Sequence, residues 1–353
     1  MVTRIREELG TCSLVNKLSM KRRNFIQQSL ATGAALGFPG MFTAYASQSV
    51  IKIGIIGLDT SHAPAFTKIF NVDTGKPEFQ GFKVIAAYPQ GSKDIESSVS
   101  RIPKYTEEVK AMGVQIVDSI QNLLKMVDVV LLETNDGRLH KEQALQVIKA
   151  GKPMFIDKPV AASLSDAIAI YDEAKKQKIP IFSCSSLRYM TGAQQVRYDN
   201  KIGKVLAADT FSPATLEPHH PDLFWYGIHG VEILFTIMGK GCESVIRHST
   251  PTTDIVIGQW ADGRVGTFRG TREGKHEYGG IAFGSEGNLV LERFEGYEAL
   301  AAKIAAFFKS KQSPIDDAET LEIYAFMEAA DESKRKGGAI VKLKEVMDKA
   351  GGR

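Results

Sequence analysis

The first half of the chain alternates short apolar segments with amphipathic segments. Short apolar runs are typical of buried strands, and apolar residues at helical spacing are typical of helices that cover a sheet. The expected strands are Val50–Ile56, Phe82–Ala87, Val114–Val117, Asp128–Glu133, Pro153–Ile156 and Pro180–Ser183. The expected helices are Ala65–Phe70, Glu96–Met112, Leu139–Ala150 and Leu164–Lys178. This alternation predicts an α/β fold with a Rossmann-type doubly wound parallel sheet over residues 47–183.

The pattern changes after Ser183, where strands follow one another with turn signals between them. The expected strands are Val205–Phe211, Ser244–Ser249, Asp254–Trp260, Arg264–Thr271, Tyr278–Gly284 and Asn288–Leu291. The expected helices are Leu223–Met238, Tyr297–Lys309 and Ala318–Lys336. We therefore predict a second, α+β domain over residues 184–345, with an open antiparallel sheet that serves substrate binding and homo-oligomerisation. The C-terminal helix is expected to pack back on the first domain.

The N-terminal segment has the pattern of an export signal. Lys21-Arg22-Arg23-Asn24-Phe25-Ile26 precedes a mildly apolar run, and the small-residue pattern Ala44-Tyr45-Ala46 follows it. The run is too short and too rich in glycine and alanine to span a bilayer. We predict a twin-arginine signal over residues 1–46, recognised by the twin-arginine export machinery, and a periplasmic protein. Translation from Met20 is a further hypothesis, in which residues 1–19 are not translated.

Charge and cysteine content narrow the classes of partner. Removal of residues 1–46, with six Lys or Arg and two Asp or Glu, changes the formal charge from +3 to −1. A nearly neutral chain lacks the basic surface that nucleic acid or anionic membrane requires, so neither partner is expected after processing. Cys184 and Cys242 would remain, and two isolated cysteines form neither a disulfide framework nor a metal motif. Their pairing with each other stays open.

The first candidate for chemistry is Lys158, in the segment Asp157-Lys158-Pro159 directly after an apolar strand. The carboxyl ends of parallel strands are where open α/β sheets bind ligands, although a solvated cation is the alternative. The order of Val127–Thr134, His140 and Asp157-Lys158-Pro159 resembles the glucose–fructose oxidoreductase/inositol dehydrogenase/MocA (Gfo/Idh/MocA) family, whose hallmark is Glu-Lys-Pro. The closing run Glu319–Leu343 is also similar. Here Asp157 replaces the glutamate.

The turn after the first strand is an incomplete dinucleotide fingerprint. Such turns carry three glycines, and this one keeps Gly57 but has Asp59 and His62 at the other two places. Asp59 adds bulk and negative charge where a diphosphate would sit. Thr60 and Ser61 offer hydroxyls, and His62 offers positive charge near a helix start. NAD or NADP is the expected cofactor, and whether it binds stays open.

The second strand ends without the carboxylate that usually binds the adenosine ribose. Gln90, Ser92 and Lys93 stand there and would suit a 2′-phosphate, or form an ordinary polar turn. The resemblance implies that Thr134 and Asn135 line the nicotinamide side, and His140 is expected to have a structural role. The full expected cofactor set is Gly57, Asp59, Thr60, Ser61, His62, Ser92, Thr134, Asn135, Asp157 and Lys158.

The resemblance also supplies a catalytic pair. Relatives carry an acid/base histidine in the motif Asp-x-Gly-x-His-x-x-Asp, and the corresponding segment Trp225–Glu232 keeps Gly227 and His229. Trp225 and Glu232 replace the two aspartates. His229 is thus the expected base for a carbinol proton, and Lys158 the group that holds the oxygen.

Substrate-binding residues are expected before this segment and at the domain crossing. They are Arg188, Tyr189, His219, His220, Asp222 and Tyr226. For Arg188 and Tyr189 a structural hinge is the alternative. His219, His220, Asp222 and His229 also have the ligand types of a divalent metal site.

Together these features predict an exported NAD(P)-dependent oxidoreductase that acts on a sugar, polyol or sugar-acid carbinol and holds its cofactor tightly. One alternative is a metal-assisted lyase or hydrolase on a sugar derivative that has abandoned the dinucleotide. Another is a carbohydrate-binding protein without turnover, although a binder gains little from a lysine and a histidine aimed at one cleft.

Overall fold

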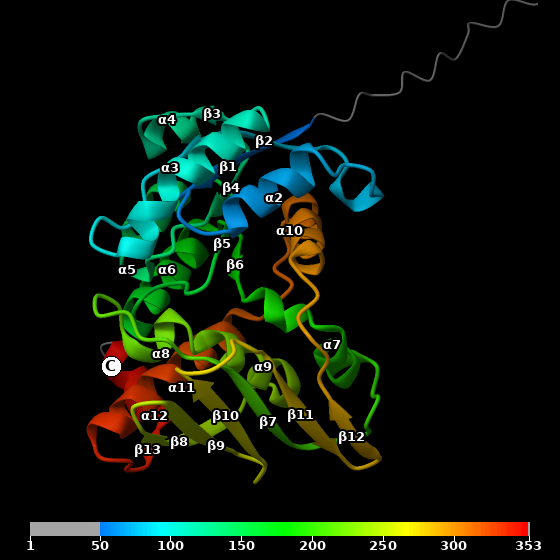
Figure 1. Cartoon of the computed structure of the whole chain (residues 1–353), viewed down its shortest axis with the longest axis vertical. Coiled ribbons are helices and arrows are strands. Elements are labelled where there is room, and N and C mark those ends of the chain that lie inside the picture. Colours follow the sequence, from blue (N-terminus) through cyan, green and yellow to red (C-terminus); the bar gives the residue numbers. More distant parts are fainter. Residues whose placement is uncertain (1–49, 352–353) are drawn as a thin grey trace, which may run out of the picture. The chain divides into compact units, whose positions relative to one another are not determined.

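The computed structural model describes residues 50–351, so the predicted export signal lies outside the described residues. The first sheet has six strands in the order β3-β2-β1-β4-β5-β6, and all its pairs are parallel (Figure 1). The strands are β1 (Ile51–Ile56), β2 (Phe82–Tyr88), β3 (Gln115–Ile116), β4 (Val129–Leu132), β5 (Met154–Ile156) and β6 (Ile181–Ser183). This order confirms the predicted doubly wound sheet.

Helices connect these strands, as the amphipathic segments predicted. They are α2 (His62–Asn71), α3 (Glu96–Ala111), α4 (Ile120–Leu124), α5 (Gly137–Lys149) and α6 (Leu164–Gln177), with a 3₁₀ turn η1 (Pro77–Phe79). Side chains cap three of the helix starts, because Ser119, Asp136 and Ser163 each accept a hydrogen bond from a first-turn N–H. Helix α4 was not predicted, since five residues are too few to show a helical period.

The second sheet has seven strands in the order β12-β11-β7-β10-β9-β8-β13. They are β7 (Val205–Pro213), β8 (Cys242–Ser249), β9 (Thr253–Trp260), β10 (Val265–Thr271), β11 (Gly279–Gly284), β12 (Gly287–Val290) and β13 (Val341–Lys342). Its pairs are antiparallel except that of β7 with β10, which is parallel. The sheet is therefore open, as predicted, but it is mixed. The expectation of a fully antiparallel sheet is wrong for one pair, because β10 runs parallel to β7.

Seven further helical segments follow β6. They are η2 (Ser186–Tyr189), α7 (Thr191–Tyr198), α8 (Asp222–Trp225), α9 (Ile228–Met238), α10 (Glu298–Ser310), α11 (Asp317–Arg335) and α12 (Leu343–Ala350). The single helix expected over 223–238 is broken at Tyr226 and Gly227. A Cβ at Gly227 would lie 2.8 Å from the Leu223 side chain, so this close approach requires glycine. Every residue of α9 is buried, which places the helix between the sheet and its neighbours.

The C-terminal helices return to the first sheet. Helix α10 lies against α2 and η1, and α11 contacts α6 as well as β8 (Figure 1). Phe307 of α10 packs edge-on against Phe182 of β6, with ring centroids 4.8 Å apart. The Val160 N–H donates to the Tyr324 hydroxyl of α11. These contacts attach α10 and α11 to the first sheet and its helices.

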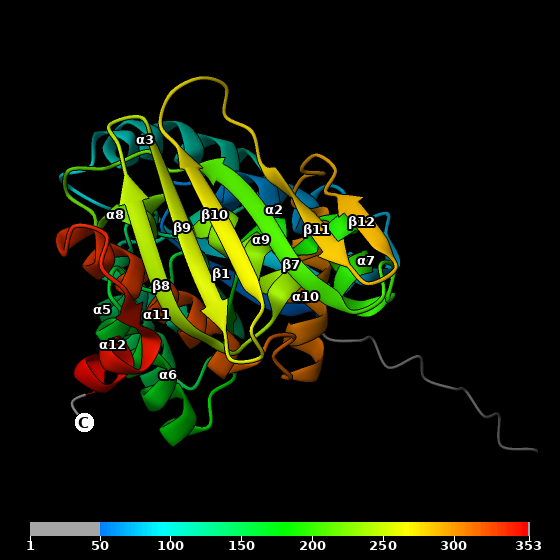
Figure 2. The same ribbon diagram turned by 90° about the horizontal axis from the view of Figure 1, so that it is seen from below.

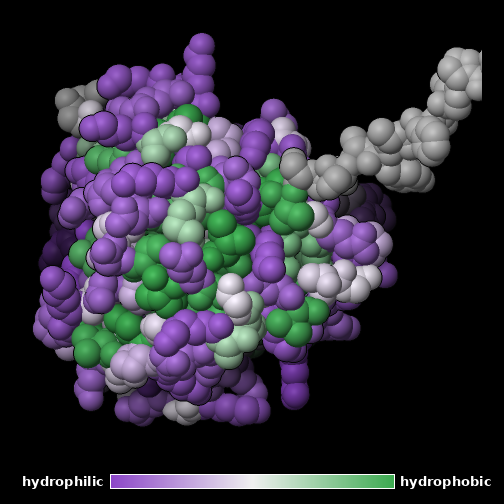
Figure 3. All heavy atoms as spheres, turned by 90° about the horizontal axis from the view of Figure 1, so that it is seen from above, coloured by the Kyte–Doolittle hydropathy of each residue, from purple (hydrophilic) through white to green (hydrophobic). Residues whose placement is uncertain are grey.

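One face of the second sheet carries no helix (Figure 2). Leu206, Phe211 and Val265 are exposed on its strands. Elsewhere in the described residues, Cys184 and Cys242 are buried and do not form a disulfide with each other. From the opposite direction, apolar residues gather within a mostly hydrophilic surface (Figure 3). Within residues 50–351, none of the helices combines the length and hydrophobicity needed to cross a membrane.

Candidate active site

A cavity of about 190 Å³ lies at the carboxyl ends of β1, β4 and β5. The first sheet contributes loop residues that follow these strands, namely Thr60, Ser61, His62, Asn135, Asp157 and Lys158. The second part of the chain contributes an aromatic wall and a histidine, namely Tyr226, His229, Tyr278, Phe294 and Tyr297. The cavity therefore brings together Lys158 and His229, the two residues expected to carry the chemistry.

Lys158 is held by its neighbours in the chain. Its backbone N–H donates to Oδ1 of Asp157 at 2.8 Å, and its peptide bond to Pro159 is cis. Its Nζ lies 5.7 Å from the centre of the Tyr226 ring, and the side chain is 7% exposed. The amine is thus directed into the cavity, which disfavours the alternative of a solvated strand-end cation.

His229 reaches the cavity from the first turn of α9. Its Nδ1 lies 2.7 Å from the hydroxyl of Ser185, and its ring packs edge-on against Tyr226 and Tyr278 at 5.0 and 5.7 Å. Burial, with Lys158 and His62 nearby, lowers the pKa of His229 well below its usual value. The imidazole is therefore neutral at neutral pH and able to accept a proton.

Two carboxylates and a histidine meet at the cavity floor. The Nδ1 of His62 lies 2.8 Å from Oδ2 of Asp157 and 3.8 Å from Oε2 of Glu133. Burial opposes ionisation of Asp157, but His62 and the Lys158 N–H hold its pKa below the usual range. Burial and the charge of Asp157 raise the pKa of Glu133 well above its usual value. His62 thus faces two carboxylates, and the contact with an anionic ligand expected for it stays a prediction.

His140 connects the loops that carry the cavity residues. Its Nδ1 lies 2.7 Å from the carbonyl of Pro159, and its Nε2 lies 2.6 Å from the carbonyl of Thr134. Burial lowers its pKa. His140 therefore links the loop after β4 to the loop after β5 through its two ring nitrogens. It does not line the cavity, which agrees with the structural role predicted for it.

The turn after β1 fits a dinucleotide in part. Gly57 has φ +90°, and a Cβ there would lie 2.6 Å from Thr134, so the tight turn requires glycine. Thr60 and Thr134 each carry a buried hydroxyl without a partner among the described residues. Such hydroxyls would suit the polar groups of a ligand at the nicotinamide end, where Asn135 and Lys158 line the cavity.

The diphosphate part of the turn does not fit. Asp59 is fully buried and accepts hydrogen bonds from the Ser98 hydroxyl at 2.5 Å and the Asn135 N–H at 3.0 Å. Its carboxylate fills the space up to Gly91, where a Cβ would lie 2.0 Å from Oδ2. Burial raises the pKa of Asp59, against the hydrogen bonds it accepts. A diphosphate would have to displace this side chain.

The loop after β2 is also tied to the protein itself. Ser92 donates to Asp94 at 2.8 Å, and Arg138 bonds to both Asp94 and Asp136. Ser92 is buried and bonded within this loop, and its contact with the cofactor stays a prediction. Gln90 and Lys93 line a separate cavity of about 330 Å³ near β2 and α4.

Arg188 and Tyr189 do not line the cavity. Arg188 is 2% exposed, its Nε donates to Glu232, and an NH group lies 2.8 Å from Glu319. Tyr189 is also buried, beneath Lys303. Both side chains are engaged within the protein, as the hinge interpretation expects, and their substrate contacts stay a prediction.

The loop before α8 is likewise directed elsewhere. Nδ1 of His219 lies 2.9 Å from Glu217, and His220 packs against Trp225 with ring centroids 5.2 Å apart. Burial lowers the pKa of His220 to about 4. Asp222 forms ion pairs with Arg247 and Lys334 at 2.8 and 2.6 Å. Among the described residues, His219, His220, Asp222 and His229 do not converge, so they form no metal site.

Sequence reasoning missed several residues that build the site. Ser185, Tyr278 and Tyr297 lie far from the catalytic pair in sequence and carry no motif. Glu133 had a signal, since it is a charged residue that ends the apolar strand Val129–Leu132 inside a buried sheet.

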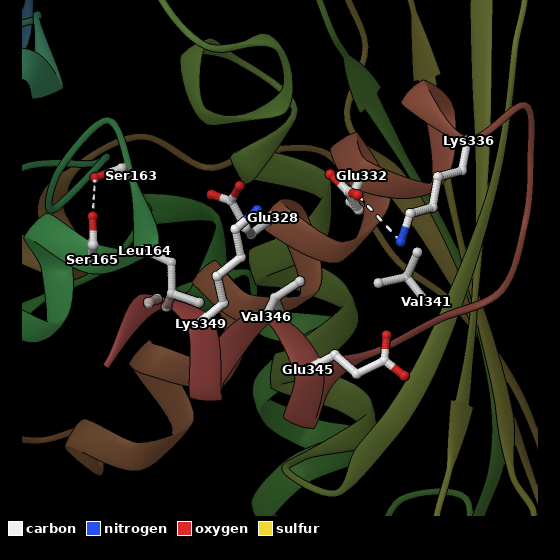
Figure 4. A pocket seen from close by; sticks show the side chains of 11 residues that line it. Ser163, Leu164, Ser165, Glu328, Glu332, Lys336, Val341, Glu345, Val346 and Lys349 are labelled. Carbon is white, nitrogen blue, oxygen red and sulfur yellow. Dashed lines mark hydrogen bonds and ion pairs between the residues drawn. The ribbon is translucent and has the colours of Figure 1, made fainter. Parts of the chain in front are cut away.

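A larger cavity of about 400 Å³ lies between α6, α11 and α12, away from this site. Its side chains include Ser163, Glu328, Glu345 and Lys349, and its ion pair joins Glu332 to Lys336 at 3.2 Å (Figure 4). The charged side chains that line it are exposed or half-buried, unlike the buried titratable groups found beside Lys158. We therefore assign the chemistry to the smaller cavity.

Comparison with known proteins bears on the first sheet. Residues 51–183 match the oxidoreductase family with an NAD-binding Rossmann fold. This match supports the Gfo/Idh/MocA resemblance for the region that contains Asp59, Glu133 and Lys158.

Individual relatives are distant. An uncharacterized oxidoreductase of Streptococcus pneumoniae is 24% identical over 220 residues, which cover 60% of this chain and 55% of the relative. The 1,5-anhydro-D-fructose reductase of Ensifer adhaerens is 32% identical over 96 residues, which cover 26% of this chain and 28% of the enzyme. The chain thus spans about half or less of the length of these curated relatives.

Solved structures share the fold over most of the described residues. The scyllo-inositol dehydrogenase of Lactobacillus casei, solved with NAD(H) and scyllo-inositol, has a TM-score of 0.66 at 18% identity. The likeness covers 84% of this chain and 100% of that one. At this identity it shows the fold, a Rossmann-type domain followed by a domain with an open sheet.

Proposed function

We propose that this protein is an oxidoreductase that acts on a carbinol of a sugar, polyol or sugar acid, with NAD or NADP as the hydride carrier. The observation that carries the proposal is the convergence of Lys158 and His229 on one cavity walled by aromatic rings. The family match of residues 51–183 supports it, as do the sugar and inositol substrates named for the reductase and dehydrogenase relatives.

The two residues have complementary tasks in such a reaction. A neutral His229 accepts the hydroxyl proton, and its low pKa keeps it neutral below neutral pH. If Nδ1–H donates to Ser185, the lone pair of Nε2 is the one that faces the cavity. Lys158 donates hydrogen bonds to the same oxygen and stabilises negative charge as it develops.

The cavity wall suits a polyhydroxylated ring. The hydroxyls of Tyr226 and Tyr278 are hydrogen-bonded at 3.0 Å, and those of Ser61 and Tyr297 at 3.3 Å. Phe294 packs against Tyr297, with ring centroids 5.5 Å apart. Aromatic faces with hydroxyl edges bury the carbon face of a sugar and bind its oxygen atoms.

The cofactor would supply hydride transfer when bound. Thr60, Asn135, Thr134 and Lys158 would hold its nicotinamide end, whereas Asp59 obstructs the diphosphate. No step of the proton transfer described above depends on its position.

Released nucleotide tests the proposal directly. The purified protein is denatured, the supernatant is analysed by mass spectrometry, and the melting temperature is measured with NAD or NADP added. We expect NAD or NADP in the supernatant, or an increase in melting temperature with one of them. Absence of both results would contradict the proposal.

Export and assembly are further parts of the proposal. The twin-arginine segment supports a periplasmic location, since that route carries folded proteins with their cofactor. Fractionation of cells that express Arg22→Lys/Arg23→Lys should then find the protein in the cytoplasm. The uncovered face of the second sheet supports a homo-oligomer, which sedimentation would detect.

A metal-assisted lyase or hydrolase is the second candidate. The observation that favours it is the cluster of His62, Glu133 and Asp157, in combination with the obstructed diphosphate turn. It differs from the first candidate in needing a cation and no dinucleotide.

A further inference from the structure

Glu133 and Asp157 lie side by side because of the sheet register. Leu132 of β4 pairs with Ile156 of β5, and each carboxylate follows its strand by one residue. Side chains alternate between the faces of a sheet, so both carboxylates share the face of Leu131 and Phe155. That face packs against Phe66 of α2, with the rings of Phe66 and Phe155 6.3 Å apart.

His62, at the first position of α2, completes the cluster. One ligand atom from each of His62, Glu133 and Asp157 lies within 4.8 Å of the others, and the closest pair is 2.8 Å apart. Ligand atoms around one ion with bonds of about 2.0–2.2 Å lie about 3.0–3.6 Å apart. Side-chain adjustments of about an ångström would therefore close the three groups around a cation.

Glu133 gives independent evidence for a missing partner. It is fully buried, and neither carboxylate oxygen has a hydrogen-bond partner among the described residues. Asp157, by contrast, is satisfied by His62 and by the Lys158 N–H. A buried carboxylate without donors, next to a second carboxylate, is unfavourable unless positive charge is supplied. Lys158 supplies one charge for the two carboxylates.

We propose that His62, Glu133 and Asp157 bind one divalent transition-metal cation at the floor of the cavity. The site is distinct from the set of His219, His220, Asp222 and His229, which does not assemble. Metal binding can be measured separately from dinucleotide binding, because Asp59, the side chain that obstructs the diphosphate, is not one of the three ligands.

The cluster has the form of a site with an open position. His62 and Asp157 line the cavity, while Glu133 lies beneath them. Three protein ligands leave room for one ligand from the cavity, the arrangement by which catalytic cations bind a substrate oxygen. The ring of His62 is held in place by Tyr297, with centroids 4.6 Å apart. An oxygen bound to the cation would lie on the side of the cavity that faces Lys158 and His229.

The donor set selects the class of ion. One imidazole nitrogen and two carboxylates suit Zn²⁺ or Mn²⁺ better than Cu⁺, which prefers sulfur, or Ca²⁺, which prefers oxygen alone. The site contains no sulfur, since Cys184 is not a member of the cluster. Zn²⁺ and Mn²⁺ are therefore the probes of choice.

The test measures metal binding directly. The full chain is purified without chelator, its metal content is measured by mass spectrometry, and the stripped protein is titrated with Mn²⁺ and with Zn²⁺. Mn²⁺ binding is followed by electron paramagnetic resonance and Zn²⁺ binding by calorimetry. We expect one ion per chain for either metal.

Variants assign the ion to the cluster. Glu133→Gln keeps the shape of the side chain and removes its charge, and His62→Asn keeps a donor toward Asp157. Each should weaken Mn²⁺ binding by more than about 100-fold, since even outer groups of metal sites contribute 10- to 100-fold. The matched control is Glu217→Gln with His219→Asn, which changes a pair of the same residue types, 2.9 Å apart and outside the cluster, and should bind Mn²⁺ as the parent does. Circular dichroism and melting curves identify variants that fold.

The outcomes separate clearly. Loss of binding in folded Glu133→Gln or His62→Asn, with binding retained in the control, supports the site. Equal binding in all variants would show that the ion binds at another site. No binding in the parent would show that Glu133 is a protonated group without a metal. Either result overturns the proposal. Nucleotide release, measured on the same samples, reports on the dinucleotide and does not depend on these results.

Discussion

The Nδ1 of His62 lies 2.8 Å from Oδ2 of Asp157, so the start of helix α2 is joined to the end of strand β5 beneath the cavity. In the expected fingerprint, His62 stands where a glycine allows a helix to approach a diphosphate. Here the same position carries an imidazole that faces a carboxylate. The first turn of this domain has therefore acquired a polar cluster beside Lys158 that the dinucleotide fingerprint does not include.

His229 should act as a base over an unusually wide pH range. Burial and the charge of Lys158 lower its pKa, so the neutral form persists below the usual histidine pKa of about 6.5. We expect kcat/KM to stay level through pH 6, and His229→Asn to lower kcat by about 10²- to 10⁴-fold. pH–rate profiles check this, with His219→Asn as the control. A decline in the kcat/KM of the parent protein centred near pH 6.5 would contradict the lowered pKa of His229.

Lys158 should contribute to the reaction and little to folding. Lys158→Met removes the amine that polarises the substrate oxygen, and we expect kcat to fall by about 10²- to 10³-fold. Steady-state kinetics and melting curves measure both effects, and Lys149→Met, at an exposed position on α5, serves as the control. Full activity of folded Lys158→Met would show that the amine is a bystander.

Asp59 should weaken dinucleotide binding through its charge and volume. Asp59→Asn keeps a side chain that can accept the Asn135 N–H and removes the negative charge. Two unit charges about 5 Å apart at an effective dielectric constant of about 20 repel by about 3 kcal/mol, so we expect affinity to rise at least about tenfold at pH 8. Calorimetric titration with NAD and NADP measures it. An unchanged affinity would mean that the diphosphate does not approach Asp59.

Arg188 should prove structural. It lies between the buried carboxylates of Glu232 and Glu319, and Arg188→Met leaves both without this cation. We expect a loss of about 3–5 kcal/mol in the free energy of unfolding, as for other broken buried pairs. Denaturant unfolding measures this loss of free energy. The control is Arg335→Met, which removes an exposed arginine paired with Glu332. If Arg188→Met unfolds like the parent but raises KM, Arg188 contacts substrate after all.

Asp331 should make stability depend on pH. Burial raises its pKa from 3.8 to about 7, although Arg247 opposes the shift. Because the folded-state pKa is the higher one, the stabilisation by protonated Asp331 is complete below about pH 3.8 and is lost as pH rises through about 7. Asp331→Asn should therefore flatten the decline in melting temperature between about pH 4 and pH 7. Asp348→Asn, on the exposed face of α12, should leave that decline as in the parent.

The sequence predicts the sheets better than the site. Alternation of apolar and polar positions locates every strand of the first sheet, because a doubly wound sheet needs continuous apolar strands. It misses the short helices α4, α7 and α12 and the two-residue strand β13, and it joins α8 to α9 across Gly227. The return of β10 beside β7 depends on packing between distant segments, so local pattern cannot reveal that the pair is parallel.

Within the site, residues next to strand ends are predictable and their partners are not. Lys158 and His229 stand in recognisable segments, whereas Ser185 and Tyr278 join them only through the packing of the second sheet. Arg188 was predicted as a substrate contact because it stands at the domain crossing, yet two buried glutamates from α9 and α11 pair with it. Those glutamates lie 44 and 131 positions away in sequence, where no motif links them to it.

The account rests on the claim that the cavity beside Lys158 and His229 binds a nicotinamide dinucleotide for chemistry on a carbinol. Native mass spectrometry of the folded protein, before and after incubation with NAD and NADP, tests it most directly. The account predicts a mass increase equal to one dinucleotide per chain, which disappears on denaturation. A folded protein that shows no such increase with either nucleotide would contradict it.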